Sequence, residues 1–152
     1  IRKTLEEAHL PPASYDAIAM IDVLEHLPSP SAVVKHCAAA LKTGGVLYAV
    51  TPDIRGPVAR AMGGYWWGLR PSHIHYFHRA SLAKMLGDAG FELKFVKSYG
   101  KIFTYSYWLS RIKNYPRWVY KTAEACIDFA GVSNKFLYID THDSLEFVAV
   151  KK

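Results

Sequence analysis

The feature that most constrains the fold is a strand–helix–strand pattern in the first third of the chain. Ala17–Ile21 and Val46–Val50 are uninterrupted apolar runs, and residues 31–42 between them carry apolar side chains at helical spacing. An unbroken apolar run is typical of a strand buried on both faces, as in a parallel sheet. Strand, helix and strand within about 35 residues form a βαβ unit, which is almost always right-handed. The sequence therefore predicts an α/β fold.

Polar side chains follow the first strand of this unit. Asp22 ends the apolar run, and Glu25 and His26 come directly after it. In open α/β sheets, ligands bind beyond the carboxyl ends of the strands. A histidine there could act as general base on a hydroxyl, because its pKa lies near neutral pH, and Glu25 could orient it. The alternative is that Glu25 and His26 only cap the next turn and shape a pocket.

Three segments, in order, carry a family resemblance. They are YDAIAMIDVLEHLPSP at 15–30, LKTGGVLYAVTP at 41–52 and HIHYFHRASLAKMLGDAGF at 73–91. Together they resemble the class I S-adenosylmethionine-dependent methyltransferases, and within them the small-molecule branch that includes the ubiquinone-biosynthesis O-methyltransferases. The resemblance implies the carboxyl-terminal half of a doubly wound, mostly parallel, Rossmann-like sheet, with a helical insertion before the last strand. It implies methyl transfer from S-adenosyl-L-methionine to a small-molecule substrate.

The resemblance also implies residues for the cofactor site. Thr4 and Leu5 match a loop in which a polar residue and its apolar neighbour meet the adenine. Asp22 matches the residue nearest the reactive methyl group, with Val23 beside it. The alternative for Asp22 is a turn cap, since aspartate is common at strand ends.

The acceptor side is expected to use histidines and tryptophans. His26, His73 and His75 are the predicted catalytic residues, and Trp66 and Trp67 the predicted substrate-binding ones, because aromatic rings stack on planar ligands. The alternative is that the two tryptophans only anchor their loop in the core. His73, His75 and His78 have metal-ligand character, but no carboxylate lies within six residues before them or nine after. We therefore expect no metal site.

The family's glycine-rich cofactor turn and the acidic residue that binds ribose are not among residues 1–152. We therefore predict a partial methyltransferase domain over residues 1–152. In the family the strand at 17–21 is central, so one of its edges is expected to be bare, which invites pairing in a homodimer. The competing function is a non-catalytic binding domain that keeps part of the fold.

The positive charge of the chain is concentrated in one segment. Seven basic residues and no acidic one lie between Glu92 and Glu124, and eight Tyr, Trp or Phe residues accompany them between positions 99 and 120. Residues 100–135 are predicted as a helical insertion, broken near Asn114-Tyr115-Pro116. The first interpretation is a cap that buries its aromatic rings. The alternative is peripheral membrane contact through 99–121, as in a membrane-associated quinone or lipid methyltransferase. We expect no nucleic-acid partner.

Compartment is constrained by cysteine content and hydropathy. Two cysteines, Cys37 and Cys126, do not make a disulfide framework. No apolar run approaches the roughly 18 residues of a membrane span, and no signal peptide is visible. We therefore expect a cytoplasmic protein.

Overall fold

The computed structural model describes residues 10–113 and 115–152. It divides into two compact units, which are described separately. The first contains the described residues up to Tyr99 together with Thr141–Lys152, and the second is Gly100–Asp140. Thr4 and Leu5 lie outside the described residues.

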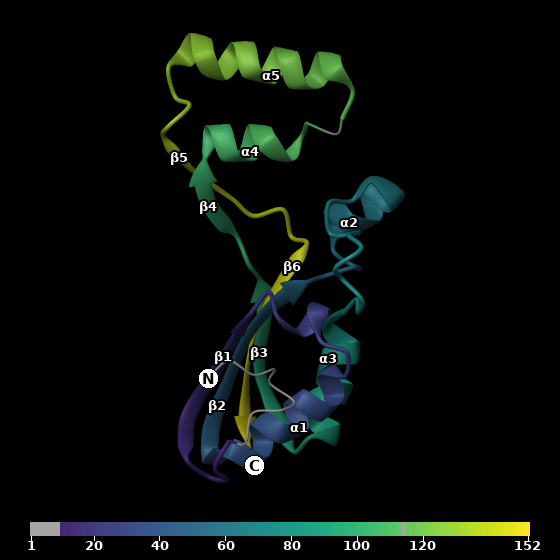
Figure 1. The fold of residues 1–152 in the computed structure, drawn as a ribbon, viewed down its shortest axis with the longest axis vertical. Helices are drawn as coiled ribbons and strands as arrows, with labels where there is room; N and C mark the ends of the chain where they lie inside the picture. Colours follow the sequence, from purple (N-terminus) through teal and green to yellow (C-terminus); the bar gives the residue numbers. More distant parts are fainter. Residues whose placement is uncertain (1–9, 114) are drawn as a thin grey trace. The chain divides into compact units, whose positions relative to one another are not determined.

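The first unit is built on a four-stranded sheet in the order β1-β2-β6-β3 (Figure 1). The strands are β1 (Tyr15–Ile21), β2 (Leu41–Pro52), β3 (Phe91–Ser98) and β6 (Ser144–Lys151). β1 and β2 pair in parallel, whereas β6 pairs antiparallel with both β2 and β3. Three strands thus share one direction and the last strand runs against them. This confirms the predicted α/β class.

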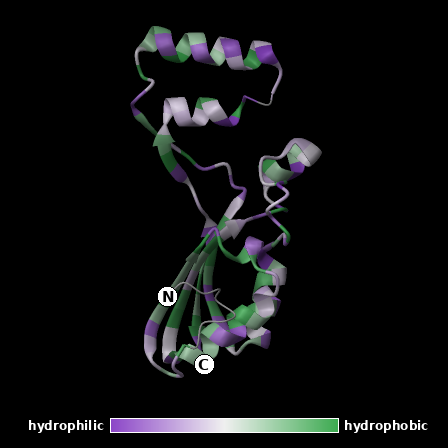
Figure 2. Ribbon diagram, in the orientation of Figure 1, coloured by the Kyte–Doolittle hydropathy of each residue, from purple (hydrophilic) through white to green (hydrophobic). Residues whose placement is uncertain are grey.

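Two helices cover one face of this sheet. α1 (Pro30–Ala40) and α3 (Arg79–Asp88) contact each other, and they pack against β2 and β3 respectively (Figure 1). The strands beneath them are strongly apolar (Figure 2). The side chains buried between helices and sheet include Val34, Leu47, Leu86, Phe91 and Phe147. Among the described residues, the two long helices of this unit lie on the same face.

β1 lies at an edge of the sheet. Among the described strands it pairs only with β2. Five of its seven residues are exposed, and Met20 is its one buried residue. The bare edge expected for this strand is therefore present in the described part of the chain.

The predicted end of the first helix is wrong. The helical spacing over residues 31–42 places that end at Lys42, but α1 ends at Ala40. Gly44, with φ +77°, instead lies within β2, where the register slips between the pairs Tyr15–Leu41 and Ala17–Val46. Gly44 therefore allows the positive φ that this irregularity in the strand pairing requires.

The second unit combines two helices with a two-stranded ribbon. The helices are α4 (Tyr105–Arg111) and α5 (Arg117–Ala130), and the ribbon pairs β4 (Lys101–Thr104) with β5 (Phe136–Ile139) antiparallel. Trp108 Nε1 donates to the Leu137 carbonyl at 3.2 Å, and the centre of the Phe103 ring lies 4.0 Å from that of Tyr107. These two contacts hold α4 against the ribbon. The ribbon was not predicted. None of the helices in the described ranges is both long and apolar enough to span a bilayer.

The two thiols are expected to differ sharply in reactivity. Cys37 is buried in α1, and loss of solvation raises its pKa to about 11, whereas Cys126 is exposed. Since the thiolate is the reactive form, one thiol per chain should react quickly with a disulfide reagent near pH 8 and the second only after denaturation. Cys126→Ser should abolish the fast phase. Two equally fast thiols in the native protein would contradict this.

Candidate functional site

The carboxyl end of β1 makes a sharp turn. Asp22 has φ +51°, a left-handed conformation that few residues other than glycine adopt, and its amide donates to the Val50 carbonyl at 3.0 Å. Val23 packs against the core. The chain then enters the short 3-10 helix η1 (Leu24–His26). The turn therefore places Glu25 and His26 beside the end of the parallel pair β1–β2.

Glu25 is a buried carboxylate with only one oxygen bonded. Its side chain is 1% exposed, and Thr51 Oγ1, at the end of β2, donates to Oε2 at 3.0 Å. Oε1 is buried and has no hydrogen-bond partner. Leaving such a group unpartnered costs about 1–3 kcal/mol, and more for a charged one. An orphan of this kind points to a ligand or to a catalytic role.

The segment around His73 is fastened to the same turn. The amides of Ile74 and His75 donate to the Glu25 carbonyl at 3.0 and 3.2 Å. The His26 and His73 rings consequently lie 4.8 Å apart, edge to face. His73 is 9% exposed, whereas His26 is exposed, so the group opens to solvent at His26. We call Glu25, His26 and His73 the Glu25 cluster.

Hydrogen bonds define which ring nitrogens are available. Nδ1 of His26 lies 2.7 Å from the Ser72 carbonyl, and Nδ1 of His73 lies 2.7 Å from the Gly68 carbonyl. A carbonyl oxygen only accepts, so Nδ1 must carry the proton in each ring. In the neutral form, each Nε2 then keeps its lone pair. Histidine metal ligands are oriented by backbone carbonyls in the same way.

The Glu25 cluster has the composition of a cation site. One carboxylate oxygen and one nitrogen from each ring lie within 4.8 Å of one another. Two histidines and one carboxylate bind zinc in several enzymes. Ligands about 2.1 Å from a zinc ion would lie closer together than this, so the side chains would have to rotate inward on binding. We expected no metal site because no carboxylate is close in sequence to His73, His75 and His78. Folding nevertheless places Glu25, 48 residues before His73, beside that histidine.

The other predicted histidine stands apart from the Glu25 cluster. His75 is half-buried, and its Nε2 lies 3.4 Å from the Pro28 carbonyl. His78 caps α3, where its ring accepts from the Ser81 amide and Ser81 Oγ receives the His78 amide. The structure therefore gathers His26 and His73 and leaves His75 at the margin.

The two tryptophans share a buried anchor that the sequence did not reveal. Asp143 is 1% exposed, and its Oδ2 accepts from Trp66 Nε1 at 2.7 Å and Trp67 Nε1 at 2.5 Å. Trp66 is 2% exposed, which does not fit the predicted stacking on a substrate. Trp67 is only partly buried and carries Arg70 above its ring at 5.4 Å. No sequence signal links Asp143 to tryptophans more than 70 residues earlier.

Comparison with known proteins identifies the family. A methyltransferase domain family matches residues 2–94. A ubiquinone biosynthesis O-methyltransferase from Xanthomonas euvesicatoria is 35% identical over 91 residues, which are 55% of this chain and 38% of the relative, so the chain spans well under half of that protein. 

Solved structures share the fold. A SAM-dependent methyltransferase from Thermotoga maritima matches all of this chain and 63% of its own, with TM-score 0.65 and 17% identity. One from Archaeoglobus fulgidus matches 99% of this chain and 66% of its own, with TM-score 0.59 and 16% identity. The chain therefore belongs to the methyltransferase domain family.

Proposed function

We propose that this chain takes part in methyl transfer from S-adenosylmethionine to a hydroxyl oxygen of a small planar acceptor. The observation that carries the proposal is the Glu25 cluster, in which a buried carboxylate that has one oxygen without a partner lies close to two oriented imidazoles. The cluster stands at the carboxyl ends of β1 and β2, where ligands bind in open α/β sheets. The printed name of the Xanthomonas relative, an O-methyltransferase, supports an oxygen acceptor.

The residues divide between donor and acceptor. Asp22 and Val23 would line the cofactor side, as would Thr4 and Leu5. The Glu25 cluster would receive the acceptor hydroxyl, and Trp67 would contact its ring. In the reaction an O–CH₃ bond forms as the S–CH₃ bond breaks, the electron pair stays on sulfur, and the hydroxyl proton leaves. Positioning of the two reactants supplies most of the rate in such a displacement.

The cluster can assist the loss of that proton in two ways. A divalent cation held by Glu25, His26 and His73 would bind the acceptor oxygen and lower the pKa of its hydroxyl. Without a cation, His26 Nε2 is available to take the proton directly, with Glu25 nearby. The unpartnered Oε1 favours the first way, since a general base at His26 leaves that oxygen unexplained.

Two measurements on the chain test this function. Calorimetric titration with Zn²⁺ should give one site per chain, and S-adenosylmethionine with a catechol should yield S-adenosylhomocysteine and the methyl ether. Chelation should remove turnover, and added Zn²⁺ should restore it. Turnover that survives chelation but fails in His26→Gln would assign the proton to His26 instead. If S-adenosylmethionine binds in calorimetry and a catechol is still never methylated under any of these conditions, the hydroxyl acceptor is refuted.

A further inference from the structure

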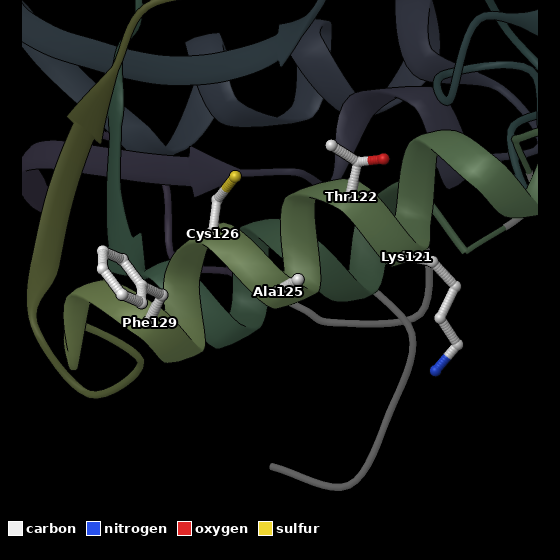
Figure 3. Close-up of a pocket in the computed structure, with 5 residues that line it drawn as sticks. All are labelled: Lys121, Thr122, Ala125, Cys126 and Phe129. Carbon is white, nitrogen blue, oxygen red and sulfur yellow. The ribbon is translucent and has the colours of Figure 1, made fainter.

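Helix α5 has apolar residues on two sides. Val119, Ala123 and Ile127 are half-buried, and α5 packs against α4. A second row is exposed: Trp118 is 73% and Phe129 97% exposed, and Thr122 and Ala125 lie between them. Figure 3 shows Thr122, Ala125 and Phe129 projecting from the helix with Lys121 and Cys126, which together line a shallow hollow. We call Trp118, Thr122, Ala125 and Phe129 the outer stripe.

The outer stripe has the spacing of a helix–helix contact and is nearly symmetric end to end. Its members follow one another at intervals of four, three and four residues, the spacing of core positions in a coiled coil. Reversing the helix exchanges Trp118 with Phe129 and Thr122 with Ala125. Two copies packed antiparallel would therefore set a large ring against a large ring at each end. Two small residues would meet in the middle, where the backbones must approach closely.

The charges beside the outer stripe match in the same arrangement. Lys121 and Asp128 lie on one flank, seven residues apart, and Val119 and Cys126 lie on the other. In an antiparallel pair related by a two-fold axis, like flanks face each other. Lys121 of each copy then faces Asp128 of the other, while Val119 faces Cys126. Opposite charges would meet twice and apolar groups twice, with no like charges directly opposed on these flanks.

We propose that the outer stripe of α5 binds a second copy of this chain in an antiparallel, two-fold contact. A membrane surface fits the helix less well. Arg117 and Lys121 of α5 are balanced by Glu124 and Asp128, whereas helices that lie on anionic bilayers carry mainly Lys and Arg on the polar face. Glu124 also already pairs with Lys121 at 2.6 Å. One helix per copy is a small interface, so we expect a dissociation constant of about 10–100 μM.

Charge reversal tests the contact without removing any apolar group. Lys121→Glu would place two acids opposite each other, and Asp128→Lys two bases. Sedimentation equilibrium should show each variant about tenfold or more weaker in self-association than the parent chain. An equimolar mixture of the two variants should associate again, because each copy then offers the complement of the other. Lys135→Glu, the same charge change on an exposed residue outside α5, is the matched control.

A second variant probes the apolar part of the outer stripe. The Phe129 side chain is almost fully exposed in the single chain, so the Phe129→Asp variant should fold normally. It should weaken self-association about 100-fold. A parent chain that stays monomeric at several hundred micromolar would overturn the proposal. So would association that survives both Phe129→Asp and Lys121→Glu, which would place the contact elsewhere, for example at the β1 edge. Binding of monomers to anionic vesicles through Trp118 and Phe129 would assign the outer stripe to a membrane.

Discussion

Replacing Glu25 with glutamine is expected to remove function while stabilising the fold. The amide keeps an oxygen for the Thr51 hydroxyl, which now donates to Oε2 at 3.0 Å. It replaces an unpartnered, buried carboxylate oxygen by an N–H₂ group that can donate to a neighbouring imidazole. We expect a gain in the free energy of unfolding of about 1 kcal/mol, and a fall in Zn²⁺ affinity and methyl transfer of at least about 100-fold.

The opposite signs make this a sharp test. Replacing a residue that stabilises the fold lowers the free energy of unfolding, whereas replacing a functional residue often raises it. Urea unfolding and Zn²⁺ calorimetry on the same preparation measure both quantities. Glu146→Gln is the matched control, because Glu146 is a shielded carboxylate that pairs with Lys97 at 3.5 Å, away from the Glu25 cluster. It should lose slight stability and keep the cation. Unchanged Zn²⁺ binding with weaker folding in Glu25→Gln would make Glu25 purely structural.

Local patterns in the sequence were enough to predict most of the first unit. The apolar runs at 17–21 and 46–50 fall within β1 and β2, and the helical spacing between them falls largely within α1. These elements are defined by residues close in sequence, so periodicity reveals them. The end of α1 was misplaced by two residues, because the apolar spacing continues to residue 42, where the chain has already entered β2.

Long-range partners could not be predicted in this way. Glu25 and His73 are 48 residues apart, and they meet because the Glu25 carbonyl receives the amides of Ile74 and His75. Asp143 reaches Trp66 and Trp67 from the far end of the chain. Long-range backbone hydrogen bonds and buried carboxylates of this kind produce no periodic pattern in a single sequence. The β4–β5 ribbon escaped for a similar reason, since its strands have four residues each and a helical hairpin between them.

Replacing Gly56 with alanine is expected to destabilise the fold strongly. A Cβ built there would lie 2.2 Å from the His142 carbonyl oxygen and 2.9 Å from the Asp143 Cα. Both obstacles are backbone atoms, so rotating a side chain cannot relieve the contact. The 142–143 backbone is also held in place. His142 has φ +52°, and the Asp143 carbonyl accepts from the Asp53 amide at 2.8 Å.

The cost should spread through Asp143 to the tryptophans. Any backbone shift of residues 142–143 moves the buried Asp143 carboxylate away from Trp66 and Trp67. In the parent chain its Oδ2 accepts from their Nε1 atoms at 2.7 and 2.5 Å. We expect Gly56→Ala to lower the free energy of unfolding by about 2–4 kcal/mol and to change tryptophan emission in the folded state. Urea denaturation followed by tryptophan fluorescence measures both.

Gly87→Ala provides the matched control, since it adds the same methyl group inside α3, where no atom lies within 4 Å of the new Cβ. That variant should gain about 0.5–1 kcal/mol, because alanine favours a helix over glycine. Equal unfolding midpoints for Gly56→Ala and Gly87→Ala would show that the 142–143 backbone yields freely. In that case the hydrogen bonds from the two indoles to Asp143 would not be what holds the tryptophan loop in place. The proposal that Trp67 contacts the acceptor from a fixed position would then fail.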